Sequence, residues 1–365
     1  MSRYRGTTSD SGAPISQQRE EVPVVTVKSA WAARLRNSWL ARNGAIIVIF
    51  VGVLIVTSIF VPNFLSISNI PNLLEQMSIV GIVAVGMTFV ILTGGIDLSV
   101  GSILAVSTIL YALALSHNLP SSVALLIALG SGLAFGIVNG VGIAVFNIQP
   151  FIMTLATLAV GQGIALAITN GAEVIFSTSS PLISLLGNGS FGPVPAEFVV
   201  FAVIVAVGIV VLRFTQYGRF IYATGGSIVA AWLSGIKVNW IIFSVYATVG
   251  LCAGLAGAMT AARLTTGEPT AGGTTNLDAI AAVVIGGTSL FGGIGGIAGT
   301  VMGSAVLAAV SNVLNLLGVS PYMALIVKGA IIAIAVLLIS PDLRRWIRGG
   351  WQATRKRTAG RMGST

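Results

Sequence analysis

The residues of this chain that could take part in chemistry are a few carboxylates, amides and hydroxyls set within long apolar runs. Asp97 is the clearest case, because it follows the Gly94-Gly95 pair in an otherwise apolar stretch. Charge and irregular backbone inside an apolar run persist only where protein or a water-filled cavity satisfies them. Asp97 therefore orients a half-helix beside a polar path, or it caps the N-terminus of the next helix as Asp commonly does. Both roles can hold together.

The chemistry that such residues support is recognition of a polar solute rather than bond making. Amide and hydroxyl groups on apolar helices can hydrogen-bond a solute, and they equally suit hydrogen bonds between helices. The candidates for a translocation path are Asp97, Asn139, Gln149, Phe151, Thr154, Asn312 and Asn315.

The sequence offers no catalytic or metal-binding constellation. Cys252 is the only cysteine, which excludes a disulfide framework and a thiolate cluster. A histidine-based metal site or a Ser-His-Asp triad would have to be built around His117, the only histidine, whose neighbours indicate a short solvated loop. No Gly-x-x-x-x-Gly-Lys-Ser/Thr loop is present to bind ATP phosphates. A membrane-embedded enzyme is thereby disfavoured, and ATP, if used, must be bound by another subunit.

The elements that position these residues are predicted to lie in lipid. Of the 365 residues 55% are hydrophobic and only 8% are charged, whereas a soluble domain carries about 25% charged residues. Several apolar runs approach the roughly 20 residues needed to cross a bilayer core. We expect an all-α integral membrane protein with about ten transmembrane helices, in the apolar segments 45–61, 77–92, 100–116, 121–146, 151–169, 198–212, 241–262, 279–291, 294–317 and 322–339.

The basic residues predict the orientation of this bundle. Seven precede residue 44, seven follow residue 340, and three lie in the loop 213–240. An even number of spans with both termini in the cytoplasm places these seventeen of nineteen basic residues inside, as the positive-inside rule requires. We predict a disordered basic cytoplasmic arm (1–44), a transmembrane domain (45–340) and a basic cytoplasmic tail (341–365). The tails fit anionic lipid rather than nucleic acid.

Small residues and internal echoes give further clues to the packing. Glycines recur four apart at 132, 136 and 140, at 250 and 254, and at 295, 299 and 303, which favours close helix contacts. The Pro150-Phe151 and Pro321-Tyr322 helix starts, and Asp97 and Asp278 before two spans, are each offset by five spans. Because five is an odd number, this internal similarity indicates two five-helix halves inverted in the membrane, or it is a coincidence.

Two further stretches are interrupted by glycines. Residues 228–233 in the long inward loop predict a short helix, which could lie along the membrane or dock a cytoplasmic partner. Between residues 276 and 303, glycine pairs at 286–287, 292–293 and 295–296 predict a tight re-entry between two spans.

These three stretches resemble the signature regions of the ribose-type sugar permeases of bacterial ATP-binding-cassette importers. The likeness extends over roughly residues 62–340 and includes Pro150-Phe151-Ile152 and the turn 314–320. It implies a permease dimer, homomeric or heteromeric, in the cell membrane. It also implies cytoplasmic ATP-binding-cassette subunits that use ATP and Mg, with no cofactor in this chain, and an exported solute-binding protein.

The resemblance assigns roles to two groups of residues. The loop that couples to the ATPase subunits contains Arg219, Gly225, Gly226, Ala230, Ala231 and Gly235. The outer rim on which the binding protein docks presents Glu75, Arg263 and Glu268. Three departures from the family pattern bear on the gate, the coupling loop and the fifth span. Asn276 replaces Glu, and Ser227-Ile228-Val229 stands where the loop motif usually continues Gly-Gly-Asn with a following acid. Gln162 stands where Arg is frequent.

The expected function is import of a small neutral solute, most simply a monosaccharide such as ribose, by alternating access. An ion-coupled secondary carrier or channel is the alternative, although such carriers usually hold ionisable groups deep in their spans. Here only Lys328 is plainly intramembrane, and its long side chain can snorkel. A structural membrane protein is disfavoured by the broken helices.

Overall fold

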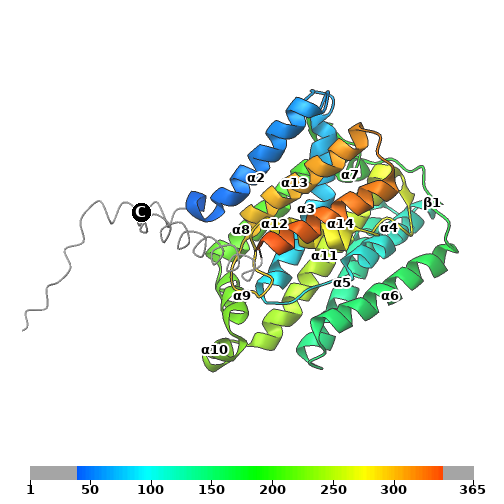
Figure 1. Cartoon of the computed structure of the whole chain (residues 1–365). Helices are drawn as coiled ribbons and strands as arrows, with labels where there is room; N and C mark the ends of the chain where they lie inside the picture. The colour runs from blue at the N-terminus through cyan, green and yellow to red at the C-terminus, as the bar shows by residue number, and fades with distance from the viewer. Residues whose placement is uncertain (1–38, 340–365) are drawn as a thin grey trace, which may run out of the picture. The chain divides into compact units, whose positions relative to one another are not determined.

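The computed structural model describes residues 39–339, which form a bundle of helices (Figure 1). Residues 1–38 of the predicted arm and the predicted tail 341–365 lie outside the described residues. The arm was predicted to reach residue 44, whereas the first described helix already begins at Trp39. Apolar residues from Ala45 onward continue this helix without a break.

Each of the ten predicted apolar segments coincides with a helix. Their bounds are α2 Trp39–Phe60, α3 Ile70–Leu92, α4 Val100–Ser116, α5 Ser121–Ala144, α6 Pro150–Thr169, α8 Ala196–Phe214, α11 Val238–Leu264, α12 Thr275–Ile285, α13 Ile297–Leu316 and α14 Pro321–Ile339. Three shorter helices, α7 Pro181–Leu186, α9 Gln216–Gly226 and α10 Ile228–Leu233, lie in the connections.

Six of the described helices are long and apolar enough to cross a membrane, namely α3, α5, α6, α8, α11 and α13. Four shorter apolar stretches of 10–17 residues accompany them: Phe50–Phe60 within α2, α4, α12 and Pro321–Ile331 within α14. The segment predicted at 279–291 is corrected most, because α12 ends at Ile285 and the chain turns through glycines with positive φ at 287, 292, 293 and 295. The predicted glycine re-entry is confirmed, and it shortens the helix before it.

The connections contain two short antiparallel strand pairs that the sequence did not predict. β1 (Val174–Ile175) pairs with β4 (Thr266–Gly267), and β2 (Ser190–Phe191) pairs with β3 (Val194–Pro195). Two-residue strands carry too little periodicity to be recognised in sequence. The β1–β4 pair joins the loops that follow α6 and α11, whereas β2 and β3 pair locally between α7 and α8.

The glycine rows bring α5 and α11 into backbone contact at the centre of the bundle. A Cβ on Gly136 would lie 2.5 Å from the carbonyl oxygen of Tyr246, and one on Gly254 would lie 2.7 Å from that of Ala128. Gly132 and Gly250 face each other's carbonyl oxygens still more closely. The predicted close packing of these rows is confirmed, and only glycine permits it.

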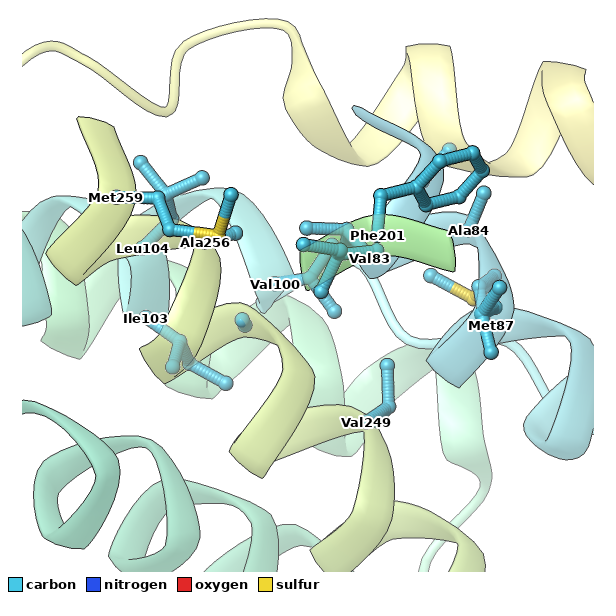
Figure 2. Packing of buried hydrophobic residues seen from close by; sticks show 14 of the residues in the cluster. Val83, Ala84, Met87, Val100, Ile103, Leu104, Phe201, Val249, Ala256 and Met259 are labelled. Carbon is cyan, nitrogen blue, oxygen red and sulfur yellow. The ribbon is translucent and has the colours of Figure 1, made fainter. Parts of the chain in front are cut away.

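Around this contact, the core is built from apolar side chains of α3, α4, α8 and α11. Figure 2 shows the ring of Phe201 from α8 beside Ala84 of α3, with Met259 of α11 near Leu104 of α4. All four side chains are buried. Such packing fixes the helices that carry the polar residues.

The bundle has two ends with different structures (Figure 1). α9 and α10 lie at one end, together with the glycine turn between α12 and α13. β1 and α7 lie at the other end, where α11 ends and α14 begins. We call these the α10 end and the β1 end.

Candidate functional site

Asp97 is the centre of a buried polar network. Its Oδ1 accepts hydrogen bonds from the backbone N (2.8 Å) and the Oγ (2.6 Å) of Ser99. Asn139 Nδ2 donates to Ser99 Oγ at 2.8 Å and approaches Asp97 Oδ2 at 3.4 Å, and Thr157 Oγ1 donates to Asn139 Oδ1 at 2.8 Å. Asp97, Ser99 and Asn139 have no exposed surface. The network links the α3–α4 break to α5 and α6.

The prediction that Asp97 caps the following helix is wrong. α4 begins at Val100 with Ser99 as its N-cap residue, and Asp97 instead closes an Asx-type turn onto the Ser99 N–H. Thr154 Oγ1 contacts the Ile96 carbonyl oxygen at 3.4 Å from α6, so a second predicted path residue borders the same turn. This arrangement satisfies the irregular backbone that the Gly94-Gly95 pair creates.

The remaining path candidates are dispersed. Gln149 and Phe151 are exposed at the start of α6. Asn312 is buried and exchanges two side-chain hydrogen bonds with Asn69, at 2.7 and 3.0 Å, which fastens α13 to the start of α3. Asn315 lines a cavity described below. The structure therefore joins Asp97, Asn139 and Thr154 and separates the other four. Ser99 and Thr157 were missed, because hydroxyls on apolar helices give no signal of their own.

Three glycine stretches that are far apart in sequence meet at the α10 end. The Gly293 N–H donates to the Leu92 carbonyl oxygen at 2.9 Å, which joins the α12–α13 turn to the end of α3. Gly225 of α9 packs directly on this pair, because a Cβ there would lie 2.6 Å from Gly293 N and closer still to Leu92 O. We call Leu92, Gly225 and Gly293 the glycine junction.

A tyrosine reinforces the glycine junction. The Tyr222 hydroxyl, one turn before Gly225 on α9, donates to the Gly295 carbonyl oxygen at 2.9 Å. Burial raises the pKa of Tyr222, which keeps its hydroxyl protonated as a donor. The end of α9 is thus held to the α12–α13 turn by both close packing and a hydrogen bond.

α10 covers the same residues, 228–233, as the predicted short helix, which is confirmed. Ser227 begins it, accepting a hydrogen bond from the Ala230 N–H at 3.2 Å. Ala231 is buried against the bundle, whereas Trp232 and Leu233 are 68% and 72% exposed. Of the other predicted coupling residues, Arg219, Gly226, Ala230 and Gly235 are exposed and Gly225 lies in the glycine junction. The helix therefore presents an apolar outer face.

The β1 end contains a cavity of about 410 Å³. Its lining comes from α3, α4, α11, α12, α13 and α14 and includes Gln76, Thr260, Arg263, Thr275, Asp278, Ser311, Asn315 and Lys328. Lys328 Nζ forms an ion pair with Asp278 Oδ2 at 3.1 Å. Lys328 therefore pairs with a carboxylate of α12 in this cavity. The sequence had suggested instead that its side chain snorkels toward the membrane surface. An intramembrane charge requires a partner, so the sequence indicated that Lys328 has one without identifying it as Asp278.

Two of the three predicted rim residues pair with each other. Arg263 Nη2 lies 3.2 Å from Glu75 Oε2, and both side chains are just over a quarter exposed. Glu268 is partly exposed and accepts a hydrogen bond from the Thr270 hydroxyl. All three occur near the β1 end, but the paired charges offer less free charge than the sequence suggested.

The three departures from the family pattern have local hydrogen-bonding roles. Asn276 Nδ2 donates to the Leu98 carbonyl oxygen at 3.2 Å, beside the Asp97 turn. Gln162 Nε2 donates to the Pro269 carbonyl oxygen at 3.0 Å, and Ser227 caps α10. The side chains of Asn276, Gln162 and Ser227 thus each form a hydrogen bond with a backbone group.

Comparison with known proteins gives consistent similarities. The family model described as branched-chain amino acid transport system / permease component matches residues 69–336. The ribose import permease protein RbsC of Escherichia coli K12 is 44% identical over 304 residues, covering 83% of this chain and 94% of that protein. Its namesake in Bacillus subtilis 168 is 44% identical over 299 residues, covering 82% and 92%.

A more distant relative carries a different sugar in its name. The fructose import permease protein FrcC of Rhizobium meliloti is 34% identical over 295 residues, covering 78% of this chain and 80% of that protein. No solved structure gave a significant match to the chain.

Proposed function

The chain belongs to the ribose-type permease family of ATP-binding-cassette importers, and from this premise we propose that it carries ribose or a related monosaccharide across the cell membrane. The observation that carries the proposal is the 44% identity, over 83% of the chain, to a protein named for ribose import. Because another relative is named for fructose import, the proposal includes monosaccharides other than ribose. As a permease subunit the chain is not itself an enzyme.

Its partners follow from the family. An importer permease works with cytoplasmic ATPase subunits and with a solute-binding protein. We propose that ATP and Mg are used only by those ATPase subunits, and that a second permease copy, identical or related, completes the membrane-spanning unit. The exposed apolar face of α10, formed by Trp232 and Leu233, supports docking of an ATPase subunit there.

The proposed topology has ten spans with both termini in the cytoplasm. Arg213 and Lys237 flank α9 and α10, and Arg219 lies within α9, which supports a cytoplasmic location for the α10 end. The β1 end then faces outward. Two inverted five-helix halves remain part of the proposal: α6 and α14 both begin at a proline, whereas Asp97 precedes α4 and Asp278 lies inside the first turn of α12.

The proposed mechanism is alternating access driven from the α10 end. Closure of the ATPase subunits pushes α10, and α9 passes the movement through the glycine junction to α3 and to the α12–α13 turn. A loaded binding protein docks on the rim formed by Glu75, Arg263 and Glu268. The solute passes polar groups among the seven path candidates. Close backbone packing supports this route, because a contact without side chains cannot absorb a displacement by changing rotamers.

Uptake in a deletion strain tests the function. Labelled ribose, fructose and nucleosides are offered to the strain and to its parent, with ATP depleted or, separately, with the proton gradient collapsed. Loss of one sugar's uptake in the deletion strain, with the parent's uptake sensitive to ATP depletion alone, is the expected result. Parental uptake that follows the gradient would contradict the proposal and favour an ion-coupled carrier.

A further inference from the structure

The β1 end contains a cavity lined by polar side chains of several helices. Resting on the proposed sugar import, we propose that this cavity holds one monosaccharide-sized, uncharged polyol, whose hydroxyls bond to the Asp278–Lys328 ion pair and to Gln76. Its volume of about 410 Å³ falls within the roughly 300–1,000 Å³ that small-molecule sites occupy. None of these three residues was among the path candidates.

The ion pair has hydrogen-bonding capacity left over. Asp278 Oδ2 accepts from Lys328 at 3.1 Å and from the Thr274 hydroxyl at 3.3 Å, whereas no hydrogen bond among the described residues uses Oδ1. The Lys328 ammonium has three N–H donors and spends one on Asp278 among these residues. Adjacent free donors and an acceptor match the vicinal hydroxyls of a sugar, each of which both donates and accepts.

Gln76 gives an independent indication that the cavity can bind a ligand. Its side-chain oxygen is buried, and within the described residues it has no hydrogen-bond partner. Gln76 also lines the cavity. A buried acceptor without a donor is costly and uncommon. Rotation of the flexible Gln76 side chain toward the cavity would let a solute hydroxyl satisfy it. The hydroxyl and amide groups of Thr260, Thr275, Ser311 and Asn315 surround the same space.

The charges of the cavity favour an uncharged solute over an ion. The Lys328 charge is cancelled by Asp278, and that of Arg263 by Glu75. An anion or a cation entering the cavity would therefore meet no excess of opposite charge to offset its lost hydration. A neutral polyol needs only hydrogen bonds, and these are what the lining offers.

The first test removes both charges together. The full importer is reconstituted in proteoliposomes with the Asp278→Asn/Lys328→Met double variant, and the uptake of D-ribose below saturation is measured beside ATP hydrolysis. Replacing a whole buried ion pair by uncharged residues is often neutral for stability, so a purely structural pair would leave uptake unchanged. We expect uptake to fall about tenfold or more, because hydrogen bonds to charged groups are lost. Stimulated ATP hydrolysis should stay within about twofold, since the α10 end is untouched.

A second variant keeps the proposal falsifiable if the double variant does not fold. Gln76→Leu removes the unpartnered acceptor, so thermal stability should be unchanged or raised. Reduced uptake with that stability supports a bound solute, and unchanged uptake overturns it. Glu173→Gln, an exposed charge near β1 that lies outside the cavity lining, is the matched control and should transport normally.

The wild-type arm separates the two hypotheses. Absence of ATP-dependent uptake of D-ribose and D-fructose by the wild-type importer would contradict the proposed function. Normal wild-type uptake that neither cavity variant changes would contradict the cavity site alone, and would indicate a water-filled space.

Discussion

The two ends of the bundle differ in how they are packed. At the α10 end, Gly225 and Gly293 pack backbone on backbone against Leu92, with no room for a single methyl group. At the β1 end, Lys328 and Asp278 border a cavity of about 410 Å³. The glycine junction therefore leaves no space between its backbone segments, whereas polar side chains line the cavity at the β1 end.

This difference suggests a division of work. A contact made only of backbone behaves as a stiff joint, because it has no rotamers to absorb a displacement. A polar cavity can be emptied and filled, because its groups exchange hydrogen bonds with solute or water. We therefore expect variants at the α10 end to uncouple ATP hydrolysis, and variants at the β1 end to change solute handling.

The largest effect is expected at the glycine junction. Gly225→Ala places a methyl group against Leu92 O and 2.6 Å from Gly293 N, which forces α9 away from the α12–α13 turn. Overpacking costs about 1–3 kcal/mol. Where this cost falls on the conformation that transmits the movement, coupled transport falls about five- to 150-fold. Proteoliposome uptake measures it. Gly163→Ala on α6 is the control outside the coupling loop, because a Cβ there has nothing within 4 Å. Equal activity of the two variants would contradict the stiff-joint role.

Close packing in the centre of the bundle gives a second test of the same principle. Gly132→Ala should lower stability by about 1–3 kcal/mol, because its methyl group meets the Gly250 carbonyl oxygen. Gly130→Ala, two residues earlier on α5 and in open space, should raise stability by about 0.5–1 kcal/mol. Thermal unfolding in detergent compares them. Similar shifts for both variants would show that α5 and α11 do not pack as described.

The Asp97 network holds its helices by hydrogen bonds between polar side chains, unlike the glycine contacts above. Asp97→Asn sets two amide nitrogens against each other, because Asn139 Nδ2 lies 3.4 Å from Asp97 Oδ2. The expected loss of stability is about 1–3 kcal/mol. The swap Asp97→Asn/Asn139→Asp faces a donor to an acceptor again and should recover part of the loss. If the swap is no better than the sum of its single variants, these two side chains are not coupled.

The smallest effect is expected at the partly exposed ion pair of the β1 end. Arg263→Gln breaks the contact with Glu75, and pairs in contact with solvent contribute about 0.2–1 kcal/mol. Unfolding should shift little, and the shift should shrink further in high salt. A loss above about 2 kcal/mol would mean that this pair is as structurally important as a buried one.

Sequence reasoning located the ten apolar segments and the span of α10, because apolar runs and bounding glycines are local signals. It overextended α12, since the predicted segment counted Leu290 and Phe291 beyond the glycines, whereas Gly286 and Gly287 end the helix. The Asp278–Lys328 pair could not be read directly, because 50 positions separate its members and only the fold brings them together. The glycine junction joins three stretches in the same way.

The most direct test of the ATP-driven permease is the amount of sugar taken up per ATP hydrolysed. Proteoliposomes containing this chain, its ATPase partners and internal ATP are given D-ribose and the loaded binding protein. A fixed ratio in the wild type, unaffected by ionophores, is the predicted result, with the ratio lowered in both Gly225→Ala and Asp278→Asn/Lys328→Met. Uptake that continues without ATP, or that collapses with the ion gradient, would contradict the proposal at its centre.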